Sequence, residues 1–153
     1  MSRTLKRFML LTDVGFIIYW GITFLGWIPK EYLYQDYSNP LLVAWNVSFL
    51  PLDLFISATG LTALYLCAKS NDNPAWKSLA LISLVLTFCS GLQAIAFWSI
   101  RGDFDLFWWI PNLFLLLYPL FFIPRFIHSE RGATLPRGIR SNTDNMKETK
   151  FKL

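Results

Sequence analysis

The sequence has little charge and almost none of the residues that build metal or disulfide sites. Charged residues make up 16% of its 153 positions, against about 25% in typical soluble chains. Two cysteines exclude a disulfide scaffold, and a single histidine, His128, excludes a His/Cys metal cluster. We therefore expect no metal and no cofactor. Hydrophobic residues make up 54% of the chain and aromatic residues 18%, which is typical of a small integral membrane protein.

Four apolar runs are long enough to cross a bilayer, which takes about 20 mostly apolar residues. They cover residues 8–28, 41–67, 76–100 and 104–126. Their short connections predict an all-α membrane protein with four transmembrane helices in an antiparallel bundle. Residues 1–127 then form the bundle, and residues 128–153 form a basic tail that we expect to be largely disordered. The first run resembles a signal peptide, but its length and the interrupting Asp13 favour an uncleaved span.

Cap and turn residues lie where three of the helices are expected to begin. Asparagine caps a helix, and a proline directly after it suits the first helical position. Glycine followed by aspartate supplies a turn and then a cap. These pairs are Asn39-Pro40, Asn73-Pro74 and Gly102-Asp103.

Lysine and arginine are divided unequally between the two ends of the spans. Twelve of the 14 lie on the side of the two termini, and only Lys30 and Arg101 lie on the other side. Because basic loops stay in the cytoplasm, we expect a plasma-membrane protein with both termini cytoplasmic. The formal charge of +4 therefore reflects topology, and with no nucleic-acid-binding motif present we expect no nucleic-acid partner.

Two aspartates lie inside the predicted spans, where each costs about 2.5–3.5 kcal/mol at the membrane centre. Asp13 is near the start of its span, within reach of water, Lys6 or a neighbouring helix, and both a structural and a functional role stay open. Asp53 is near the middle of span 41–67, and Pro51 just before it is expected to bend the helix. A carboxyl at that depth must face the bundle interior, a wet cavity or a partner. A neutral carboxylic acid there can donate a hydrogen bond to a ligand or to another span.

Polar side chains at similar depth predict a pocket above Asp53. Asn46, Gln93 and Asn112 each lie a few residues from the outer ends of their spans, among tryptophans. Amides between membrane helices also serve simply to hold the helices together, and taken singly these three fit that role better. The predicted ligand-binding residues are Asp53, Asn46, Gln93, Asn112, Asp13, Trp45 and Trp109.

Three functions fit this pattern. The first is binding of a small hydrophobic or lipid-like molecule, or an amphiphilic amine, with Asp53 as the polar anchor. The second is proton-coupled transport of a small molecule or cation, with Asp53 exchanging protons in a homodimer. The third is an accessory subunit that contacts another membrane protein through the small-residue stripe Ser83, Thr87 and Gly91. We prefer the first.

Catalytic motifs are not apparent. The sequence shows no nucleophile elbow, phosphate loop or Ser/His/Asp set, so we expect no catalytic residues and no enzymatic activity. Membrane lipid is the expected surrounding partner.

Three short stretches carry a resemblance to a family. LTDVGF (11–16), FLPLD (49–53) and WIPNL (109–113) resemble the uncharacterised four-span YvaD-like proteins of Bacillus-type bacteria. The resemblance covers residues 1 to about 128 and implies a four-span fold and a location in the membrane. Asp53, Asn112 and Pro119 are also similar, more faintly, to the EXPERA superfamily, which includes sterol isomerases. That similarity implies a ligand-binding cavity and not isomerase chemistry, which uses an intramembrane histidine that these spans lack.

The charge distribution makes a direct prediction about topology. A reporter that is active only outside the cytoplasm should be silent when fused after Leu153, because the basic C-terminal segment is retained inside. The same reporter fused in the loop that contains Lys30 should be active. The reverse pattern would overturn the predicted orientation.

Overall fold

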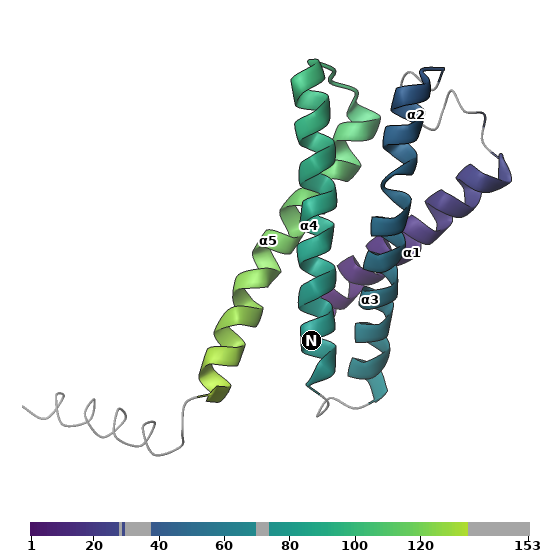
Figure 1. The fold of residues 1–153 in the computed structure, drawn as a ribbon. Coiled ribbons are helices and arrows are strands. Elements are labelled where there is room, and N and C mark those ends of the chain that lie inside the picture. The colour runs from purple at the N-terminus through teal and green to yellow at the C-terminus, as the bar shows by residue number, and fades with distance from the viewer. Residues whose placement is uncertain (28, 30–37, 70–73, 135–153) are drawn as a thin grey trace, which may run out of the picture. The chain divides into compact units, whose positions relative to one another are not determined.

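The fold is entirely helical in the part of the chain that the computed structural model describes, residues 1–27, 29, 38–69 and 74–134. The helices are α1 (Arg3–Leu25), α2 (Pro40–Val47), α3 (Leu50–Lys69), α4 (Ala75–Arg101) and α5 (Leu106–Thr134) (Figure 1). Four segments are long and apolar enough to span a membrane, with α2 and α3 forming one of them: Arg3–Leu25, Pro40–Lys69, Ala75–Arg101 and Leu106–Ile127. The predicted all-α protein with four spans is confirmed.

The outer surface of these helices is apolar, as lipid contact requires. Large hydrophobic side chains such as Ile18, Phe55, Tyr65 and Phe121 are each more than half exposed. A soluble domain rarely leaves so much apolar surface uncovered. Exposure in this chain therefore means contact with lipid along the spans.

Helix boundaries follow the predicted signal at Asn39-Pro40 in full and the one at Gly102-Asp103 in its glycine only. Asn39 caps α2 by accepting a hydrogen bond from the amide of Leu41 (3.0 Å), with Pro40 at the first helical position. Gly102 ends α4 in the left-handed conformation, with φ 69°. The cap of α5 is Asp105 and not Asp103, because its carboxylate accepts from the amide two residues on (2.7 Å). Asn73 lies outside the described residues.

The second span is interrupted inside the membrane-spanning segment. Pro51 has no amide hydrogen to donate to the carbonyl of Val47, four residues earlier. At the interruption the amide of Phe49 bonds the carbonyl of Asn46 (3.1 Å), a tight turn of the 3₁₀ type. The predicted bend is therefore a break between α2 and α3, and it places Asp53 in the first turn of a new helix.

Small residues let α4 approach its neighbours. α3 packs against both α1 and α4 (Figure 1). The hydroxyl of Ser83 on α4 donates to the carbonyl of Ile56 on α3 (3.5 Å). A Cβ on Gly91 would lie 2.8 Å from the carbonyl oxygen of Asn112 on α5. The stripe Ser83, Thr87 and Gly91 is buried inside the chain, so it does not supply the contact face that an accessory subunit would need.

Aromatic rings join α1 to α5. The ring of Phe8 meets Phe114, Tyr118 and Phe122 edge-on, with centroid distances of 5.5, 5.6 and 6.0 Å. Edge-to-face pairs of this kind add about 0.5–1.5 kcal/mol beyond the area that they bury. Of these rings, that of Phe114 also lines the cavity described below.

The last helix is longer than predicted, since it continues past residue 126 to Thr134. The chain divides into two compact units, Met1–Ile123 and Pro124–Leu153. Residues 135–153 of the predicted disordered tail lie outside the described residues, and the site lies wholly in the first unit.

The close approach at Gly91 predicts sensitivity to a single methyl group. Gly91→Ala should lower the free energy of unfolding by about 1–3 kcal/mol, because backbone atoms of α5 block the new Cβ. Gly21→Ala is the matched control, since nothing lies within 4 Å of a Cβ there and alanine is the better helix former. Thermal unfolding in detergent measures both. Equal stability of the two variants would show that the helices do not meet at Gly91.

An aromatic cavity around Asp53

A cavity of about 460 Å³ lies among the helices of the first unit, with lining residues from all five. This volume is within the range of small-molecule sites. Five polar residues line it: Thr12, Asn46, Asp53, Ser90 and Asn112. Most of the remaining wall is aromatic: Phe16, Tyr19, Trp20, Trp45, Phe49, Phe107, Trp108 and Phe114. Among the described residues no lysine, arginine or histidine lines it.

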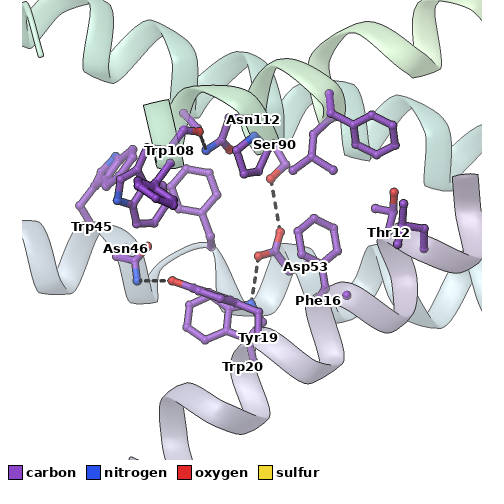
Figure 2. A pocket seen from close by; sticks show the side chains of 18 residues that line it. Thr12, Phe16, Tyr19, Trp20, Trp45, Asn46, Asp53, Ser90, Trp108 and Asn112 are labelled. Carbon is purple, nitrogen blue, oxygen red and sulfur yellow. Dashed lines mark hydrogen bonds between the residues drawn. The ribbon is translucent and has the colours of Figure 1, made fainter. Parts of the chain in front are cut away.

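Asp53 is the acidic group of this cavity, and two hydrogen bonds fix its carboxylate. The indole Nε1 of Trp20 on α1 donates to Oδ2 (2.9 Å), and the hydroxyl of Ser90 on α4 donates to Oδ1 (3.3 Å) (Figure 2). The side chain is 4% exposed. Because Asp53 lies in the first turn of α3, the positive end of the helix dipole also favours negative charge there.

The two amides of the cavity are held by local hydrogen bonds. Asn46 donates through Nδ2 to the hydroxyl of Tyr19 (3.1 Å), which joins α2 to α1. Asn112 donates through Nδ2 to the carbonyl of Trp108, one turn earlier in α5 (2.8 Å) (Figure 2). Asn46 therefore acts partly as the interhelical contact that the sequence left open, while it also lines the cavity.

A tryptophan cluster closes one end of the cavity. The ring of Trp45 stacks on Phe97 with centroids 3.9 Å apart and meets Trp98 edge-on at 5.7 Å. Trp98 in turn lies 6.2 Å from Trp108. Figure 2 shows Trp45 and Trp108 on one side of Asp53 and Thr12 on the other. The cluster ties α2, α4 and α5 together at this end.

The exposed part of the cavity lining lies on α1 and α5. Its exposed lining residues are Leu11 and Gly15 on α1 and Phe107 and Pro111 on α5. The side chain of Leu11 is 64% exposed and that of Phe107 is 89% exposed. We call this side of the cavity its mouth.

The structure brings together four of the seven predicted residues: Trp45, Asn46, Asp53 and Asn112. Gln93, Trp109 and Asp13 lie outside the cavity lining. Gln93 is exposed, because its neighbours Ser90 and Ala94 occupy the cavity-facing side of α4. Trp109 instead donates to the carbonyl of Asp103 (3.0 Å) and packs on Phe104.

Asp13 is buried at a different place. It is 0% exposed and lies against Gly60 of α3, where a Cβ would overlap its carboxylate. Neither carboxyl oxygen has a hydrogen-bond partner among the described residues. The two aspartates therefore have opposite surroundings, because Asp53 lies beside open space with two donors and Asp13 is closely packed with none.

The sequence analysis missed Trp20, Tyr19, Ser90 and Thr12 as lining residues. Trp20 carried a usable signal, since its polar N–H lies well inside the first span, away from the ends where tryptophan is usual. A buried indole needs an acceptor, and Asp53 is the acidic side chain of the next span. Ser90 carried no comparable signal, because a lone serine is common between membrane helices.

Comparison with known proteins places this structure in a family. A family of unknown function, DUF5360, matches residues 5–133. The chain is 52% identical over 121 residues to the "Uncharacterized protein YvaD" of Bacillus subtilis (strain 168), an alignment that covers 79% of this chain and 90% of that protein. No solved structure matches. Both matches agree with the YvaD-like resemblance of the sequence, and the chain belongs to the DUF5360 family.

Proposed function

We propose that this multi-pass membrane protein binds an amphiphilic cation, with an amine or ammonium head beside Asp53 and an apolar body against the aromatic wall. The observation that carries the proposal is the pairing of a fixed carboxylate with open space in a cavity that no described cationic residue lines. The preferred sequence hypothesis included such amines among its hydrophobic ligands.

The hydrogen bonds of Asp53 support a positive guest. Both carboxyl oxygens accept a hydrogen bond, from Trp20 and from Ser90, so the carboxyl group is held in one orientation beside the open space. A buried charge without a partner is costly, and acids within membrane spans are normally paired or functional. A cationic head in the cavity supplies the missing partner.

The wall supports the same class of ligand. Cations are attracted to the faces of aromatic rings, most strongly to tryptophan, by about 0.5–2 kcal/mol per contact. Trp20, Trp45 and Trp108 all line this cavity. An apolar ligand body is favoured by the remaining phenylalanines, because burial of apolar surface is the main driving force for such ligands.

The mouth supports access from the membrane. Its residues on α1 and α5 are exposed, and in the proposed function they face lipid, so an amphiphile dissolved in the bilayer can enter sideways. Our proposal places the protein in the plasma membrane with both termini cytoplasmic, on the distribution of lysine and arginine.

Replacing Asp53 by asparagine removes the charge and keeps the size of the side chain. Asp53→Asn should weaken binding of tetraphenylphosphonium to the purified protein by about tenfold or more, which corresponds to about 1.4 kcal/mol. Equilibrium dialysis in detergent measures this affinity. Asp103→Asn is the matched control, since it removes one negative charge outside the cavity.

A second ligand distinguishes a charge-selective site from one that binds any hydrophobic molecule. Tetraphenylmethane is an uncharged molecule of the same shape. It should bind the unaltered protein more weakly than the cation does, and it should bind the unaltered protein and Asp53→Asn with equal affinity. Equal affinity of the unaltered protein and Asp53→Asn for the cation would overturn the role of Asp53. Equal loss in Asp103→Asn would show that net charge alone is responsible.

A further inference from the structure

Asp13 is a buried acid that the cavity does not use. Its side chain is 0% exposed, and both carboxyl oxygens lack a hydrogen-bond partner among the described residues. An ionised carboxylate in such a place has neither water nor donors to stabilise it. The negative charge of the carboxylate must therefore be neutralised by something other than a neighbouring side chain.

The lack of space around Asp13 decides what can neutralise its charge. Asp13 lies against the α-carbon of Gly60, so closely that a Cβ at that position would overlap the carboxylate. The carboxyl is not part of the cavity wall, and the described residues form no cluster suited to a metal ion. A metal ion needs several oxygen ligands and room for its own radius. A proton needs neither.

We infer that Asp13 is a proton-binding site, separate from the ligand site at Asp53. A hydronium ion of the solvent donates the proton, one carboxylate oxygen forms the new O–H bond, and a water molecule is left behind. In the closed packing of α1 on α3 the carboxyl is the neutral acid. Release returns the proton to water and leaves a charge between the two helices.

The groups around Asp13 are consistent with an isolated proton site. On α3 the ionisable neighbour is Asp53, and the hydroxyl of Ser57 lies between them, donating to the main-chain carbonyls of Asp13 (3.0 Å) and Asp53 (2.9 Å). On α5 the ionisable neighbour is Tyr118. On α4 the polar neighbour of Tyr118 is Thr87, whose hydroxyl does not titrate. Lys6 is two turns away on α1 itself.

A route for the proton lies beside the site. Thr12 is adjacent to Asp13 in the chain and lines the cavity. Its buried hydroxyl has no hydrogen-bond partner among the described residues. Because a hydroxyl group both donates and accepts hydrogen bonds, water that enters the cavity can bind there, next to Asp13 in the chain.

Infrared spectroscopy tests the inference directly. The full-length protein in detergent at neutral pH should show the carbonyl stretch of a protonated carboxylic acid, and labelling aspartate with ¹³C at the side-chain carboxyl should shift it. The spectrum of the unaltered protein minus that of Asp13→Asn should contain this band. Asp53→Asn should retain it. No labelled protonated band in the unaltered protein, or no band in the difference spectrum, would overturn the proposal.

The pH dependence of stability is an independent measurement. If the folded chain holds one proton more than the unfolded chain, stability falls as pH rises, and the unfolding equilibrium constant increases by up to tenfold per pH unit. The fall begins at about pH 4, where an aspartate of the unfolded chain loses its proton, and ends where the folded chain releases the same proton. Over this range the Asp13→Asn variant should lack this component. Parallel curves for the variant and the unaltered protein would refute the proton site, and because neither test uses a ligand, they can fail while the cation site at Asp53 stands.

Discussion

The carboxylate of Asp53 joins three helices through two hydrogen bonds. It belongs to α3, accepts from Trp20 of α1 and accepts from Ser90 of α4. Between membrane helices there is no hydrophobic force to bring them together, so packing and polar contacts decide which faces meet. The same side chain that would be costly in lipid therefore sets the arrangement of α1, α3 and α4 around the cavity, and structure and proposed function depend on one group.

The surroundings of the two aspartates explain why one chain can keep two acids in its spans. Asp53 has donors and adjoining space, which suits a charge and a guest. Asp13 has close packing against Gly60 and no donors, which suits a neutral acid. Ser57 connects the main chains at both positions through a single hydroxyl. A change at the α1–α3 contact therefore reaches both sites.

Much of the architecture could be predicted from the sequence, because hydrophobic length and capping residues act locally. The four spans, the cap at Asn39 and the turn at Gly102 are of this kind. Depth along a span could also be predicted from the sequence, and Asn46, Asp53 and Asn112, which have the predicted depths, all line one cavity. The rotation of each helix about its axis could not be read from the sequence, because it depends on which faces pack. Gln93 has the expected position along its span, but its side chain is exposed.

The break between α2 and α3 has a mechanical consequence. Pro51 removes one amide donor, but the amides of Ser48, Phe49 and Asp53 still bond carbonyl groups about one turn earlier across the break. Trp45 and Asn46 are also held from the side, by Phe97 and Trp98 of α4 and by Tyr19 of α1. The break is therefore a fixed joint, and through it one span supplies the cavity with both an amide that holds two helices together and an acid at the start of a new helix.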